Sequence, residues 1–246
     1  MAMFPRKFAL WSRLSLLLCL PGLVGWSEMT VAAPVAPQLV SLTFPPTADR
    51  GAPSRTTGGG TRQGGSCGVA VQESLSNRLT ALAPSNNVIT TVAANPSIYI
   101  HVPSFPEKEA LFRVIDRDRE EVVYQETLKL TGESGFLKLQ LPDDVELAPN
   151  IKYEWGFFVL CNTDDPEQDR GVEGWIERLP MDTGLQAQLE GMEMSLEKAQ
   201  VYAENEVWYE TLEILLGRRE EYPTEWLEFV TSVDLSPEMA ASPIVE

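Results

Sequence analysis

The 246-residue sequence contains few cysteines, few basic residues and one histidine. Its three cysteines form no CxxC pair, which excludes the usual zinc and dithiol redox motifs. Lysine and arginine total 19 against 36 aspartates and glutamates, for a net charge of −17. Such a surface repels phosphate backbones and attracts cations and basic protein faces. We therefore expect no nucleic-acid binding.

The chain also lacks an uninterrupted apolar run long enough to cross a bilayer. Its most apolar stretch, residues 8–24, is interrupted near Arg13, and only residues 14–24 continue without a break. A spanning helix needs ~20 residues. Basic residues precede the stretch and small residues follow it, as in a secretory signal peptide. We expect residues 1–33 to be a cleaved signal peptide and the mature chain to be periplasmic or extracellular, without a stable membrane anchor. An uncleaved anchor is the alternative.

Signal removal would leave two cysteines, Cys67 and Cys161. An even count in an exported chain favours a disulfide bond. A bond between these two would close a loop of about 95 residues and stabilise the fold by about 4–5 kcal/mol in the chain-entropy model. Two unrelated buried thiols are the alternative, because spacing alone does not establish disulfide geometry.

Residues 34–66 are rich in proline, glycine, serine and threonine. A segment of this composition buries too little apolar surface to offset the entropy lost on ordering. We expect it to be a disordered tether. Its glycines form no phosphate-binding loop, because no Gly-Lys-Ser/Thr follows them and no strand precedes them.

Residues 67–180 show the two-residue period of β-strands. Leucines alternate over residues 137–141, and aromatic residues alternate over residues 153–161. About seven short strands at ~8–15-residue spacing favour an immunoglobulin-like antiparallel β-sandwich. Tyr153 follows a turn at residues 147–150, and we expect its hydroxyl group to bond back to the backbone of that corner.

Residues 181–246 change to a helical period. Thr183 with Gln186 three residues later matches a capping box. An apolar seam with spacings of three and four follows, and Gly191 or Ser195 would divide it into two helices.

Two further helices are expected, one over residues 207–219 and one beginning at Pro223. Residues 199–212 resemble one tetratricopeptide unit, without a second copy. One unit cannot bury its own apolar face, so this acidic helical hairpin must dock on the sandwich or on another protein. The expected fold class is α+β, with an all-β part followed by a segregated helical part.

Six short motifs occur in a characteristic order: RGAP to GGSC (50–67), LTALAP (79–84), YIHVP (99–103), YEW to Cys161 (153–161), GWIERL (174–179), and YAE to WYE (202–210). In this order they resemble exported cyanobacterial proteins of the domain of unknown function 928 family. The resemblance covers about Pro45 to Pro243. It implies export, paired cysteines and no established activity, and it implies no catalytic residue.

Catalytic candidates are few. His101 lies in an expected strand, where a lone histidine is usually structural, and no Gly-x-Ser-x-Gly elbow exists. Glycoside hydrolysis needs two carboxylates about 5–10 Å apart, and nothing in the sequence singles out one pair.

Calcium is the better chemical hypothesis, since Ca²⁺ prefers oxygen ligands in turns. Asp116, Asp118 and Glu120 form one candidate turn, but arginines interleave with its acids. The second candidate places Asp164, Asp165 and Asp169 in a less neutralised loop and is favoured. We expect no other cofactor.

Two adjacent aromatic residues, Trp208 and Tyr209, cannot both face one side of a helix. Both are candidate partner-binding residues. If Trp208 is buried, Tyr209 is expected to face outward from the hairpin. The leading hypothesis is a non-enzymatic extracytoplasmic adaptor for another protein of the cell envelope. One alternative is a carbohydrate-binding or glycan-hydrolysing module, which would show an exposed aromatic platform or two facing acids. The other is a calcium-stabilised structural component.

Overall fold

The computed structural model describes residues 42–45, 78–84, 86, 88–104, 106, 108–161, 169–233 and 235–245. All of them belong to one compact unit, Leu39–Glu246. The predicted signal peptide lies outside the described residues, and so does Cys67.

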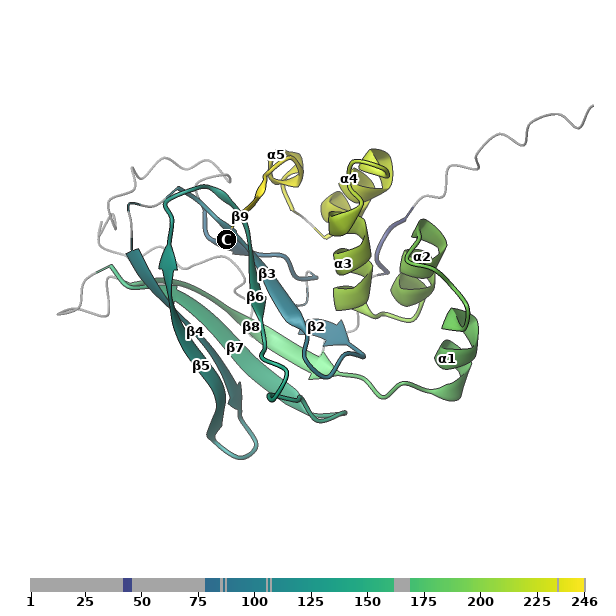
Figure 1. Cartoon of the computed structure of the whole chain (residues 1–246), viewed down its shortest axis with the longest axis horizontal. Coiled ribbons are helices and arrows are strands. Elements are labelled where there is room, and N and C mark those ends of the chain that lie inside the picture. The colour runs from purple at the N-terminus through teal and green to yellow at the C-terminus, as the bar shows by residue number, and fades with distance from the viewer. Residues whose placement is uncertain are drawn as a thin grey trace, which may run out of the picture. The chain divides into compact units, whose positions relative to one another are not determined.

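The strands form two sheets (Figure 1). The four-stranded sheet has the order β1 (Thr80–Ala81), β3 (Ser97–Val102), β6 (Gly135–Gln140) and β9 (Ile244–Val245). The five-stranded sheet has the order β2 (Val88–Thr91), β8 (Arg170–Arg178), β7 (Lys152–Val159), β4 (Lys108–Asp116) and β5 (Glu121–Leu130). Apolar side chains from both sheets belong to one hydrophobic core.

Both sheets are mixed, so the prediction of a wholly antiparallel sandwich is wrong. β2 runs parallel to β8, and β9 runs parallel to β6. The remaining neighbours are antiparallel. An alternating pattern reports which face of a strand is buried, and it carries no information about the direction of the neighbouring strand.

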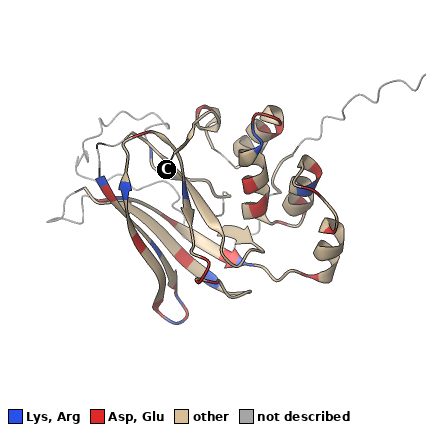
Figure 2. Cartoon of the chain, in the orientation of Figure 1, with Lys and Arg blue, Asp and Glu red and all other residues tan. Residues whose placement is uncertain are grey.

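The C-terminal region forms α1 (Thr183–Leu189), α2 (Leu196–Glu204), α3 (Trp208–Gly217), α4 (Pro223–Ser232) and α5 (Pro237–Ala240). Acidic residues outnumber basic ones on these helices (Figure 2). The two mixed sheets and the C-terminal helices confirm the α+β class.

The predicted break between α1 and α2 is confirmed. Gly191 has a φ of +74°, which favours glycine, and Ser195 caps α2 by accepting a hydrogen bond from Lys198 N. The predicted capping role of Thr183 is wrong, because the N-cap of α1 is Asp182, whose Oδ1 accepts from Leu185 N at 2.8 Å. Aspartate caps helices at least as well as threonine, so spacing alone could not choose between the two.

The helices pack on the four-stranded sheet of the same chain. Of the two docking alternatives, the sandwich or another protein, the structure therefore shows the first. Phe136 of β6 contacts Trp226 of α4 edge to face, with ring centroids 6.2 Å apart. Trp208 of α3 stacks on Phe229 of α4 at 4.7 Å. The helices therefore bury their apolar side against the chain's own sheet.

The segment 42–45 differs from the tether predicted for residues 34–66. Leu42 and Phe44 are buried, and the Phe44 ring lies 4.9 Å from the Trp208 ring. Burial of one large apolar side chain stabilises a fold by about 1.5–3 kcal/mol, so two such side chains offset much of the entropy lost on ordering four residues. The average composition of residues 34–66 is polar, so it did not indicate that these two apolar residues are buried.

The predicted Tyr153 corner is confirmed. Tyr153 is buried, and its hydroxyl oxygen accepts a 3.0 Å hydrogen bond from Ala148 N. Asn150, between them, has a φ of +62°, a left-handed conformation that asparagine tolerates better than most residues. The bond fixes the turn that leads into β7.

Candidate binding surfaces

The start of α3 is fixed to β2 through Thr90. The Thr90 hydroxyl donates to Glu206 O and accepts from Trp208 N at 3.0 Å. The Trp208 indole N–H donates to Leu82 O at 3.0 Å, and the side chain is fully buried. The prediction that Trp208 contacts a partner is therefore wrong.

Tyr209 also packs against the hydrophobic core and is partly buried, which raises the pKa of its hydroxyl. The expectation that it faces outward is wrong, because α3 is covered on more than one side. Its Thr211 hydroxyl, also fully buried, lies 3.4 Å from Ala199 O of α2. Because α3 lies between a sheet and α2, the Tyr209 side chain packs against neighbouring elements and does not project into solvent.

Glu210 is a buried acid that the sequence did not single out. Its Oε1 accepts hydrogen bonds from Thr91 Oγ1, Val92 N and Ala93 N at 2.9, 3.0 and 2.9 Å. Its Oε2 is buried without a hydrogen-bond partner. Burial raises the pKa of this carboxyl, and the three hydrogen bonds oppose the rise. Glu210 thus ties the end of β2 to α3.

His101 is an interior residue of β3, with 1% of its surface exposed. Its Nδ1 lies 3.4 Å from Arg78 O, and its ring meets Phe136 edge to face. Burial lowers the pKa of the imidazole, which favours the neutral form. These contacts assign the histidine a place in the core, as expected for a strand histidine.

The favoured calcium loop is only partly described. Asp164 and Asp165 lie outside the described residues, and Asp169 Oδ1 accepts a 2.8 Å hydrogen bond from Cys161 N. Calcium binding there stays a prediction. Within the described ranges, no group of three His, Cys, Asp or Glu side chains could hold a metal ion.

In the other candidate turn, Asp116 forms an ion pair with Arg119 of the same turn. Asp116 accepts from Asp118 N and Arg119 N through Oδ1, and from the Arg119 guanidinium through Oδ2 at 2.5 Å. Burial raises the pKa of the Asp116 carboxyl, but these hydrogen bonds and the positive charge of Arg119 together outweigh it, so the pKa is lowered. A cation at this turn would have to displace the guanidinium.

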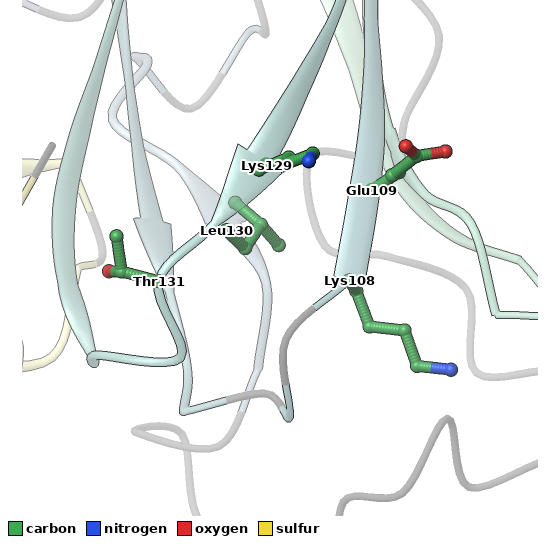
Figure 3. Close-up of a pocket in the computed structure, with 5 residues that line it drawn as sticks. All are labelled: Lys108, Glu109, Lys129, Leu130 and Thr131. Carbon is green, nitrogen blue, oxygen red and sulfur yellow. The ribbon is translucent and has the colours of Figure 1, made fainter.

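A cavity of about 420 Å³ lies at one end of β4 and β5 (Figure 3). Lys108 and Glu109 point away from each other on opposite sides of β4. Lys108 Nζ donates to Cys161 O at 3.3 Å. The charged groups do not converge on one point, so this cavity offers no built anion site.

A groove of about 530 Å³ lies along α1 and α2. Met181, at its edge, is 45% exposed, and the nearby Met194 is 52% exposed although it does not line the groove. Tyr202 of α2 is largely buried, and burial together with the nearby Glu210 carboxylate raises the pKa of its hydroxyl. Four of the lining residues are apolar or aromatic and three are polar: Met181, Ala187, Leu189 and Tyr202 with Thr183, Gln186 and Glu190. Six of the seven lining residues lie within residues 181–190, and Tyr202 of α2 completes the groove.

None of the described helices is long and apolar enough to span a membrane. Cys161 follows β7, but Cys67 lies outside the described residues, so the bond between them stays a prediction.

Comparison with known proteins finds no match among curated proteins. The model of one family, described as Domain of Unknown Function (DUF928), matches residues 57–244. The match covers β1 to β8, the five described helices and the first residue of β9. The chain therefore belongs to the DUF928 family.

Proposed function

We propose that this chain is a non-enzymatic extracytoplasmic binding protein that engages another envelope protein through the groove along α1 and α2. The occupant we propose is a basic amphipathic segment of that partner. The observation that carries the proposal is the groove itself, with exposed Met181 beside polar and acidic side chains.

The apolar part of the groove suits a partner's large apolar side chain. Methionine is flexible and polarisable, and it adapts to irregular partner surfaces. Leu189 and Tyr202 supply further apolar surface. A partner side chain placed here would leave water without giving up hydrogen bonds.

Charge favours a basic partner. Residues 182–246 contain 15 acidic and three basic residues. Of the three bases, Lys198 lies nearest the groove in sequence, and its ammonium group donates to Met192 O at 3.4 Å. Complementary charge speeds encounter and excludes partners of the same sign.

Export and the Cys67–Cys161 disulfide are parts of this proposal. They are supported by the signal-like residues 1–33 and by the even cysteine count that remains after their removal. A disulfide bond between Cys67 and Cys161 would persist in an oxidising compartment.

Photo-crosslinking in the native host tests the proposal. A photoreactive amino acid replaces Gln186, which is exposed in the groove, and as a control it replaces Thr224, which is exposed on α4. We expect one envelope protein to cross-link at position 186 and not at 224, through a segment of net positive charge. Equal adducts at both positions, or none at 186, would contradict the proposal.

A charge-reversing pair sharpens this test. Met181→Lys places a cation in the groove and should lower the adduct at position 186 by about tenfold or more, because like charges repel. Met194→Lys changes an equally exposed methionine outside the groove and should alter the adduct less than about twofold. Equal losses in both variants would show that the groove does not select the partner.

A further inference from the structure

The methionines in the described part of the chain differ in exposure. Met181 is 45% exposed and Met194 is 52% exposed, whereas Met239 of α5 is 4% exposed. Met192, between α1 and α2, is partly buried. Methionine is the apolar side chain that oxidants convert into a polar one. Exposure to solvent therefore decides which of these residues an oxidant reaches first.

Met181 is the exposed methionine that lies on the proposed binding surface. It lines the α1–α2 groove together with Leu189 and Tyr202, the other large apolar or aromatic side chains there. Met194 does not line the groove. Of two methionines with similar exposure, one can thus change the groove, and the other is its matched control.

The fold does not depend on the Met181 side chain. Met181 directly precedes Asp182, the N-cap of α1, which accepts a 2.8 Å hydrogen bond from Leu185 N. A hydrophobic residue before an N-cap often packs on the fourth helical residue. Here the fourth residue is Gln186, a polar side chain exposed to solvent. A change of polarity at Met181 therefore alters the surface and leaves the start of α1 in place.

The acidic surface selects the kind of oxidant. The chain has a net charge of −17, and Glu190 also lines the groove. Negative charge repels anionic oxidants, whereas hydrogen peroxide is neutral at physiological pH and is not repelled. A neutral hydroperoxide is therefore the class of oxidant that reaches Met181.

We propose that Met181 is a site of reversible oxidation by hydroperoxides, and that its sulfoxide closes the groove to the partner. The sulfur lone pair attacks one peroxide oxygen, and the O–O bond breaks. The departing hydroxide takes the proton of the transferred hydroxyl group and becomes water, so sulfur loses two electrons and the peroxide gains them. The product carries a polar acceptor in place of the thioether. A partner's apolar side chain would have to desolvate this acceptor without pairing it.

This inference rests on the proposed function and names a regulation of the same groove. A partner side chain seated beside Met181 would cover the sulfur and protect it from peroxide. Oxidation and partner binding therefore oppose each other, as thermodynamic linkage requires. Methionine sulfoxide reductases restore the thioether, so the change is reversible.

Peptide mass spectrometry of the purified chain tests the chemistry. After treatment with dilute hydrogen peroxide, we expect Met181 and Met194 to gain one oxygen atom at rates within about threefold of each other, and at least about tenfold faster than Met239. Met181→Gln places a polar group of similar size at the oxidised position and should melt within about 2 °C of wild type. Oxidation of Met239 as fast as Met181 would overturn the inference.

Photo-crosslinking tests the effect on the groove. The purified chain with the photoreactive residue at position 186 is oxidised, freed of peroxide and mixed with envelope extract of the native host. Oxidation should lower the adduct with the protein that cross-links in the host about fivefold or more, and sulfoxide reductases should restore it. Met181→Leu should keep its adduct after peroxide, whereas Met194→Leu should lose it as wild type does. Met181→Gln should lose it without peroxide.

The outcomes separate this inference from the proposed function. An adduct at position 186 that survives oxidation of Met181, or an equal loss in Met181→Leu, overturns the inference and leaves the proposed function standing. The absence of an adduct before any treatment overturns both.

Discussion

The Tyr99 hydroxyl group donates a 2.6 Å hydrogen bond to Glu213 Oε2 and so joins the four-stranded sheet to α3. Lys138 of the neighbouring strand binds the other oxygen of the same carboxylate at 2.7 Å. Burial, together with the Glu213 carboxylate, raises the pKa of Tyr99 well above its usual value. The raised pKa favours the protonated hydroxyl, which is the form that donates this hydrogen bond.

Replacing Glu213 should loosen this junction. Glu213→Gln keeps the size of the side chain but removes its charge, and we expect a loss of about 1–2 kcal/mol in the free energy of unfolding. Glu220→Gln changes an exposed acid after α3 and should stay within about 0.5 kcal/mol of wild type. Urea denaturation measures both. Equal stabilities would mean that the junction does not depend on the charged pair.

Glu210 should make stability depend on pH. Its folded-state pKa is raised above the ordinary value of 4.5 by burial. The folded state therefore holds this proton more tightly than the unfolded state, and the associated stability is present below about pH 4.5 and is lost as pH rises through the folded-state pKa. Relative to Glu210→Gln, wild type should become progressively less stable with rising pH. Parallel stability curves for the two proteins would refute this role.

Phe44 should stabilise the folded chain although it lies in a segment of tether-like composition. Phe44→Ala removes a ring buried against Trp208 and Phe229 and should cost about 3–5 kcal/mol. Thr43→Ala changes the exposed neighbour and should cost less than about 0.5 kcal/mol. Thermal and urea unfolding of both variants provide the comparison. A small effect at Phe44 would show that residues 42–45 are not part of the core.

The position of the Phe158 ring should require glycine at residue 171. Gly171→Ala places a methyl group 2.4 Å from the ring, and we expect a destabilisation of about 1–3 kcal/mol from overpacking. Gly217→Ala, at the end of α3 with open space around it, should instead stabilise by about 0.5–1 kcal/mol. Effects of opposite sign would support the close approach at Gly171, and a neutral Gly171→Ala would exclude it.

Features with a local cause were predictable from sequence. Leucine alternation predicted the strand that became β6, and Pro223 marked the first residue of α4. The Tyr153 hydrogen bond spans only five residues. In each case the residues that produce the structure are neighbours in the chain, so a short window contains the whole cause.

Features that join distant segments were not predictable. The parallel pairing of β2 with β8 and the insertion of Phe44 beside Trp208 depend on which surfaces meet after folding. The predicted binding residues were wrong for the same reason, since the helix sides that carry Trp208 and Tyr209 are both covered by tertiary packing. Gly156 and Gly171 within strands were the available signal for the close approach of the Phe158 ring, because glycine within a strand often marks such an approach.

The most direct test of the central claim, that this is an exported binding protein, is mass spectrometry of the chain purified from its native host. The account predicts an amino terminus within or just after residues 25–34, and a peptide in which Cys67 is linked to Cys161 until reductant is added. An intact Met1 on cytosolic protein, with both thiols alkylated without reductant, would contradict it.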